Sequence, residues 1–255
     1  MSLFRIVVGL WALLLAPSSV ANKIESLTVA VASNFVHPMA QLASKFEQEH
    51  KVRIEIISGS TGLLAAQIQR GAPIDVFFAA DQQRPKQLAE NQLVETPKTY
   101  AAGKLVLWWP GSKISDWQTF IAKPPKAIVI ADPSLAPYGV AARQVLVNTV
   151  IASNKQVLAN NINQAFQYVD SGNIEAGLLA QSSLLLAMKK FGDQRYKATV
   201  LVPPQLYEPI LQDVAVVKRS KKLPLARRFV DYILAPQQQQ QIVSLGYQAM
   251  ERVDG

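Results

Sequence analysis

Hydroxyl and amide side chains follow two apolar runs of this 255-residue chain, at positions where helices are expected to begin. Ser33 and Asn34 come directly after LTVAVA, and Ser60 and Thr61 lie in the turn SGSTG after VRIEII. A helix N-terminus has unpaired N–H groups and about half a positive charge, so added hydroxyls suit an oxyanion without any basic residue. Because the same residue types are favoured N-caps, simple capping remains the alternative.

Two pairs of ionisable residues are better explained by structural roles than by catalysis or binding. His37 falls in the first turn of an expected helix and His50 at its end, so both are interpreted as surface or capping residues. Asp75 and Asp81 flank an apolar run like a carboxylate pair, and we interpret them as contacts that cap a helix or support a hinge.

Several enzyme classes are excluded by composition and motifs. Cysteine is absent and histidine occurs twice, which excludes disulfides, a thiolate nucleophile and a cysteine-built zinc site. Ser33, Ser60 or Ser182 could act as a nucleophile, but no G-x-S-x-G motif occurs and no histidine is suitably placed. The turn SGSTG is not a P-loop, because no lysine follows it. We therefore expect no catalytic residues, no bound metal cation and no cofactor.

The chain is basic but lacks the pattern of a nucleic-acid surface. Lys and Arg total 26 and Asp and Glu total 18, a formal charge of +8. No dense basic stripe with interleaved aromatic residues occurs, and the basic run KRSKK at residues 218–222 is interpreted as a solvated surface turn. Hydrophobic residues make up 49% of the chain, which excludes intrinsic disorder.

The first 21 residues have the pattern of a secretory signal peptide. Arg5 precedes the apolar run IVVGLWALLLA, and Ser19 and Ala21 place small residues at the −3 and −1 positions of a cleavage site. The apolar run is too short for a membrane-spanning helix, which needs about 20 residues. We expect cleavage near Ala21 and a mature protein in the periplasm.

The remaining sequence alternates strands and helices, which predicts an α/β fold with mostly parallel sheets. The chain is expected to cross between two lobes near Gly103 and Asp213. Strands are expected at residues 27–32, 52–57, 74–79, 104–109, 127–131, 174–179, 198–202 and 214–217, and helices at 35–50, 63–70, 83–90, 140–150, 162–169, 180–190, 224–234 and 236–245.

Four segments in this order resemble one known family. They are LTVAVASNF with MAQLASKFEQEH, ISGSTGLLAAQIQRGAPIDVFFAAD, IADPSLAPYGVAARQVL and VDSGNIEAGLL. Together they look like the periplasmic molybdate-binding proteins of molybdate ABC transporters, over nearly all of the mature chain. The resemblance implies a type II periplasmic binding protein: two α/β lobes, a two-strand hinge and a ligand in the cleft. Residues 22–103 and 214–255 would form lobe 1, and residues 104–213 lobe 2.

The resemblance also implies a set of ligand-binding residues. Lobe 1 would offer Ser33 with the Asn34 backbone, and Ser60 with Thr61, while lobe 2 would offer Tyr138 and the N–H of Ile162. Some relatives carry a binding tyrosine where this chain has Ala180, so Tyr138 would supply the phenol here.

The implied function is capture of molybdate or tungstate by a monomer that delivers it to the membrane permease of an ABC importer. Neutral donors suit an unprotonated dianion, whereas a protonated phosphate needs an acceptor. Sulfate or another oxyanion remains an alternative ligand. A hydrolase or transferase on the same scaffold and a receptor for a membrane sensor are further alternatives.

Overall fold

The computed structural model describes residues 24–149, 155–192, 196 and 198–248. The expected signal peptide, residues 1–21, lies outside these ranges. No helix within the described ranges has the length and apolar character needed to span a membrane.

The first lobe is built on a five-stranded sheet with the order β2-β1-β3-β10-β4. Strand β10 runs antiparallel to both neighbours, so the other four strands point the same way. The strands are β1 (Ser26–Ala32), β2 (Arg53–Gly59), β3 (Val76–Phe78), β4 (Lys98–Gly103) and β10 (Ile210–Val216).

The second lobe has a five-stranded sheet with the order β7-β6-β8-β5-β9, in which β5 runs against the others. Its strands are β5 (Leu105–Trp108), β6 (Ala127–Ala131), β7 (Lys155–Ala159), β8 (Ala176–Ala180) and β9 (Thr199–Leu201). Two sheets of mostly parallel strands flanked by helices confirm the predicted α/β architecture.

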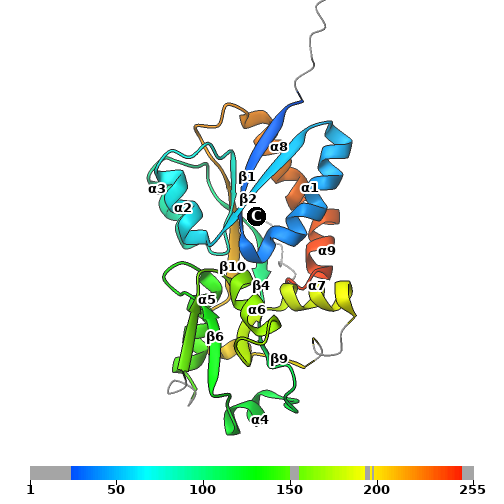
Figure 1. The fold of residues 1–255 in the computed structure, drawn as a ribbon. Helices are drawn as coiled ribbons and strands as arrows, with labels where there is room; N and C mark the ends of the chain where they lie inside the picture. The colour runs from blue at the N-terminus through cyan, green and yellow to red at the C-terminus, as the bar shows by residue number, and fades with distance from the viewer. Residues whose placement is uncertain (1–23, 150–154, 193–195, 197, 249–255) are drawn as a thin grey trace, which may run out of the picture.

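Helices cover both faces of the first sheet (Figure 1). Along β1, Leu27, Val29 and Val31 pack into one core with α1 and α8, whereas Ala30 packs into a second core with α2. This is the two-residue alternation of a strand covered on both faces. The helices of this lobe are α1 (Val36–His50), preceded by the 3₁₀ turn η1 (Ser33–Phe35), α2 (Thr61–Gln69), α3 (Gln83–Glu90), α8 (Leu223–Leu234) and α9 (Pro236–Ser244).

The second lobe carries α4 (Trp117–Ala122), α5 (Pro137–Val147), α6 (Ile162–Asp170) and α7 (Gln181–Phe191). The 3₁₀ turn η4 (Pro204–Leu206) precedes the return to the first lobe. Two chain segments visibly join the lobes, β4 into β5 and the entry to β10 (Figure 1). Gly103 pairs with Ile210 where these segments run side by side.

Some element boundaries differ from the expected ones. The helix expected at 140–150 begins at Pro137, because proline is well suited to the first helical position, and so it contains Tyr138. Strands β4 and β7 and helix α4 were not predicted, since KTYAAG, KQVLA and WQTFIA are short and weakly patterned.

The basic run lies in a turn in which Lys218, Arg219 and Lys221 are exposed, as predicted, and side-chain contacts also anchor this turn to the protein. Arg219 donates hydrogen bonds to the carbonyls of Ile68 and Ala72. Ser220 Oγ donates to Asp75 Oδ1 at 2.6 Å, and Lys222 Nζ lies 3.2 Å from Asp75 Oδ2. Asp75 therefore ties this turn to the start of β3.

Candidate functional site

The two hydroxyl segments of the first lobe lie side by side. Strands β1 and β2 are parallel neighbours whose last aligned pair is Ala32 with Gly59. The residues that follow this pair are Ser33 and Ser60, and both are buried, with exposed fractions of 5% and 3%. Because carboxyl ends of parallel strands share one edge of a sheet, the register brings the two serines together.

Ser60 occupies the N-cap position of α2 without acting as a cap. Its backbone is extended, as an N-cap requires, but its side chain makes no hydrogen bond to the helix. Among the residues that the structure describes, Ser60 Oγ is buried and has no hydrogen-bond partner. A buried hydroxyl without a partner costs about 1–3 kcal/mol, so the arrangement is that of a donor held ready for another molecule. The capping alternative does not describe this serine.

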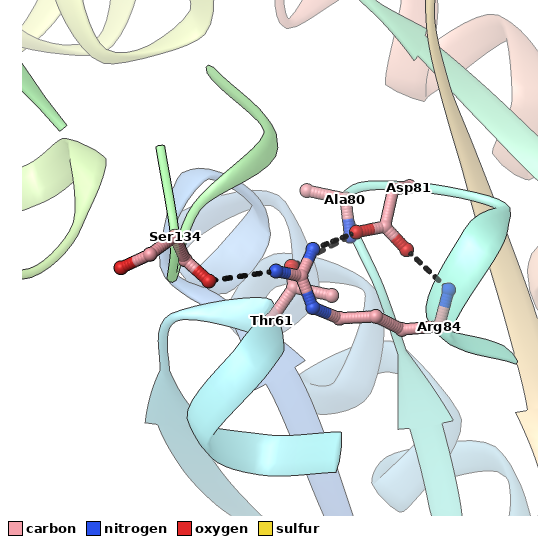
Figure 2. Close-up of polar contacts among 5 residues, drawn as sticks. All are labelled: Thr61, Ala80, Asp81, Arg84 and Ser134. Atoms are coloured by element: carbon pink, nitrogen blue, oxygen red, sulfur yellow. Dashed lines mark hydrogen bonds and ion pairs between the residues drawn. The ribbon is translucent and has the colours of Figure 1, made fainter. Parts of the chain in front are cut away.

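Thr61, unlike Ser60, uses its side-chain oxygen in a hydrogen bond within the protein. Its Oγ1 accepts a hydrogen bond from the backbone N–H of Ala80 at 3.0 Å, just after β3 ends (Figure 2). This contact ties the start of α2 to the end of β3. Because Oγ1 is the acceptor there, the hydroxyl proton of Thr61 is left to donate elsewhere.

In the second lobe, Tyr138 lies in the first turn of α5 and is buried. The preceding loop is shaped by Asp132, whose Oδ1 accepts from the N–H of Ser134 at 2.8 Å and from its hydroxyl at 2.7 Å. Gly139 allows the helix to start close to β6, since a Cβ there would lie 2.2 Å from the carbonyl oxygen of Ala131.

Ile162 is the first residue of α6 and is buried. The N-cap residue Asn161 accepts a hydrogen bond from the N–H of Gln164 at 3.0 Å. Gln164 Oε1 in turn accepts from the N–H of Asn160 at 2.6 Å. The N–H of Ile162 lies in the first turn, where a helix supplies no internal partner, so it is positioned as a donor.

Two hydrogen bonds to backbone carbonyls join the two lobes beside these residues. Asn163 Nδ2 on α6 donates to the carbonyl of Ser33 at 2.7 Å. The N–H of Gly62 on α2 donates to the carbonyl of Leu135, before α5, at 2.9 Å. The helix starts that carry the lobe 1 and lobe 2 candidates therefore face one another.

A third contact between the lobes comes from Arg84. Its guanidinium forms an ion pair with Asp81 and donates to the carbonyl of Ser134 at 3.0 Å (Figure 2). Asp81 also accepts from the N–H of Arg84 at 3.0 Å, at the start of α3. The expectation that Asp81 caps a helix or supports a hinge agrees with these contacts.

The side chain of Asn34 belongs to a buried hydrogen-bond network under the site. Asn34 Nδ2 donates to Gln212 Oε1 at 2.9 Å and to the hydroxyl of Tyr247 at 3.1 Å. Gln212 Oε1 lies 3.0 Å from the hydroxyl of Tyr100, and Gln212 Nε2 lies 3.5 Å from that of Tyr138. The sequence analysis did not single out Gln212, which is fully buried in β10. The detectable signal was an amide within the mostly apolar run ILQDVAV.

The candidate residues provide neutral donors. Burial raises the pKa of the Tyr138 phenol well above its ordinary value, and the neighbouring Tyr247 adds to this shift. Tyr138 is therefore a neutral hydroxyl at physiological pH. The described residues contain no group of three or more His, Asp or Glu side chains arranged to hold a metal ion. The arrangement suits an oxyanion that accepts hydrogen bonds and carries no proton.

The remaining candidates are the two histidines, which lie apart from this arrangement, and Ser182, which lies beside the residue that precedes Tyr247 of the network. His37 is exposed on α1, and His50 is the last residue of that helix. Partial desolvation of its ring, and secondly the nearby Lys190, lower the pKa of His37. Ser182 is buried in the first turn of α7 beside Gly246. No histidine forms a hydrogen bond with Ser33, Ser60 or Ser182 among the contacts of the described residues.

Comparisons with known proteins agree with this geometry. A family described as bacterial extracellular solute-binding proteins matches residues 27–248. The molybdate-binding protein ModA of Azotobacter vinelandii is 39% identical over 253 residues, covering 96% of this chain and 98% of that protein. ModA of Rhodobacter capsulatus is 31% identical and covers 86% of each chain. The solved periplasmic molybdate-binding protein of A. vinelandii superposes with a TM-score of 0.79 at 31% identity, covering 88% of this chain and all of that one.

Proposed function

We propose, from the premise that this chain belongs to the family of bacterial extracellular solute-binding proteins, that it captures molybdate between its two lobes. The ligand residues are the six that the family resemblance implies: Ser33, Asn34, Ser60, Thr61, Tyr138 and Ile162. Tungstate, which has the same charge and nearly the same size, binds in the same place.

The observation that carries this proposal is the unpartnered hydroxyl of Ser60. It lies at the N-terminus of α2, where the helix dipole and free N–H groups favour an anion. An anion that accepts from Ser60 Oγ would supply the hydrogen bond that the protein leaves unmade. Identity of 39% to a molybdate-binding protein then favours molybdate among the oxyanions.

Selection against phosphate follows from the donor set. Hydrogen phosphate carries a proton that needs an acceptor, whereas molybdate at neutral pH has none to donate. Serine and tyrosine hydroxyls and backbone N–H groups satisfy the oxygens of molybdate, and no carboxylate stands among the six residues to accept a proton.

Isothermal titration of ligand-stripped mature protein tests the proposal directly. Molybdate, tungstate, sulfate and phosphate are titrated in turn. We expect one-to-one binding of the first two, weak binding of sulfate and no heat with phosphate. No heat with any of the four anions would overturn the proposal.

Sulfate is the second candidate ligand, because the same donors suit any unprotonated tetrahedral dianion. Sulfate and molybdate differ chiefly in size, so the volume left between the lobes separates them. Tighter binding of sulfate than of molybdate in the same titrations would favour this candidate.

Family membership and the sequence pattern of residues 1–21 support the remaining features of the proposal. The mature protein is a periplasmic monomer, released by cleavage near Ala21, that performs no chemistry on its ligand. Residues 22–103 and 214–255 form one lobe and residues 104–213 the other, except that residues 210–213 begin β10 in the sheet of the first lobe. Closure presents both lobes to the permease of an ABC importer. A permease that hydrolyses ATP faster with the loaded protein, and not with the empty one, would support delivery; a response from a membrane sensor instead would favour a receptor role.

A further inference from the structure

We propose that Tyr247 and Gln212, which are not among the ligand residues, form a hydrogen-bond relay that fixes the Tyr138 hydroxyl as a donor toward the ligand. This inference rests on the proposed function, because it concerns the same oxyanion site. It assigns two positioning residues, one on the strand β10 that joins the lobes and one near the C-terminal end of the described chain.

The relay starts at a backbone carbonyl, which can only accept. The hydroxyl of Tyr247 donates to the carbonyl oxygen of Asn34 at 2.8 Å. The single proton of Tyr247 is thereby used, so its oxygen serves as an acceptor for the Asn34 side chain at 3.1 Å. Asn34 must present its NH₂ group to Tyr247, and its amide orientation is fixed.

The orientation of Asn34 then determines that of Gln212. The second proton of Asn34 Nδ2 is directed at Gln212, 2.9 Å away, so Gln212 must present its oxygen there. Its NH₂ group therefore points at the hydroxyl oxygen of Tyr138, at a long 3.5 Å. Because a phenol oxygen that receives a proton keeps its own to donate, the Tyr138 proton is directed to a partner other than Gln212.

The order of donors and acceptors matters because all four side chains of the relay are buried. Gln212 is fully buried, and Asn34, Tyr138 and Tyr247 are each at least 96% buried. Water is thus excluded as an alternative partner, and a mismatched donor or acceptor would remain unpaired.

Gly103 leaves the space in which Gln212 and Tyr138 approach each other. A Cβ at this position would lie 2.2 Å from the Tyr138 hydroxyl oxygen and 2.8 Å from Gln212 Nε2. Any other residue would separate the two groups. Gly103 ends β4 and pairs with Ile210 of β10, so the relay reaches Tyr138 at the joint between the lobes.

The relay predicts coupling between Tyr247 and Tyr138, which a double-mutant cycle measures. The variants Tyr247→Phe, Tyr138→Phe and the double variant are titrated with molybdate. Tyr247→Phe is expected to weaken binding by roughly threefold to tenfold when Tyr138 is present, and less than about twofold in the Tyr138→Phe background. Equal losses in both backgrounds would overturn the relay, because Tyr247 would then act independently of the phenol.

Tyr232→Phe is the matched control. This phenol also donates to a backbone carbonyl, that of Leu42 at 3.2 Å, but it lies on α8 away from the site. Its loss should leave molybdate affinity unchanged.

A second readout needs no ligand and keeps the relay separate from the proposed function. In ¹H–¹⁵N spectra of the ligand-stripped protein, the side-chain NH₂ signal of Gln212 is identified by its absence in Gln212→Glu. This signal is expected to shift in Tyr138→Phe and in Tyr247→Phe, but not in Tyr232→Phe. Failure of wild-type protein to bind molybdate would overturn the proposed function, whereas an unmoved Gln212 signal would overturn the relay alone.

Discussion

The guanidinium of Arg84 in one lobe donates a hydrogen bond to the carbonyl oxygen of Ser134 in the other, at 3.0 Å (Figure 2). Asp81 holds the same guanidinium and directly follows Ala80, whose N–H donates to Thr61. The contact of Arg84 with the other lobe is thus connected, through Asp81 and Ala80, to the hydroxyl of Thr61. Because the affinity of a closing protein rises with the population of its closed state, this contact contributes to ligand retention.

Removal of the Arg84 contact should accelerate ligand release. Arg84→Gln keeps hydrogen-bonding atoms but cannot span from Asp81 to Ser134, so we expect molybdate affinity to fall about threefold to tenfold, mainly through dissociation. Stopped-flow measurement of dissociation checks this result. Arg227→Gln is the matched control, since Arg227 pairs with Glu95 within a single lobe. Equal dissociation rates in the two variants would contradict the role of Arg84.

Ser60→Ala should separate affinity from stability. We expect molybdate binding to weaken by about 1–3 kcal/mol, the value of a hydrogen bond to a charged group. The melting temperature of the ligand-free protein should stay the same or rise, because the hydroxyl has no partner among the described residues. Thr61→Val provides the contrast, because it leaves the Ala80 N–H without its acceptor and should lower the melting temperature. A matching loss of stability in Ser60→Ala would show that this serine is structural.

The affinity for molybdate should stay constant from pH 7 to about 10. Binding needs the neutral Tyr138 phenol, and burial raises its pKa well above the ordinary value near 10, so the donor is retained across this range. Stability behaves differently, because burial also raises the pKa of Tyr100 and Tyr247. The unfolded chain loses these protons first, so the free energy of unfolding should fall as pH rises through 10. Titrations and urea unfolding across this range check both results; a loss of affinity with a midpoint near 10 would contradict the first.

Asp75→Asn should lower stability without changing ligand preference. Asp75 accepts from the N–H of Thr28 at 2.8 Å and from Ser220, and it pairs with Lys222. Asp75 directly precedes β3, so these contacts lie at the start of that strand, at the end opposite to the site. We expect the free energy of unfolding to fall by about 1–3 kcal/mol, measured by urea denaturation. Asp231→Asn, which removes the exposed pair with Lys98, should have little effect. A changed ratio of molybdate to sulfate affinity in Asp75→Asn would contradict this prediction.

The fold was predictable because its strongest signals are local. Apolar runs such as LTVAVA are typical of buried parallel strands, and β1 occupies Ser26–Ala32. Elements with short or weakly apolar sequences were missed, as with β7, whose residues 155–159 are largely exposed or half-buried. Their pairing with stronger neighbours determines their structure, and a single sequence does not display that pairing.

The sequence by itself determined that hydroxyl residues follow β1 and β2 where helices begin, and the family resemblance added Tyr138 and Ile162. The tertiary structure alone decided which of these groups are already paired. Ser60 and Thr61 are adjacent and chemically similar, yet Thr61 is bonded to Ala80 while Ser60 has no partner among the described residues. Gln212 lies beside the site only because β10 brings it within hydrogen-bond distance of Asn34. The physical reason is that hydrogen bonds act over about 3 Å, so a group's partner depends on chain segments that are distant in sequence.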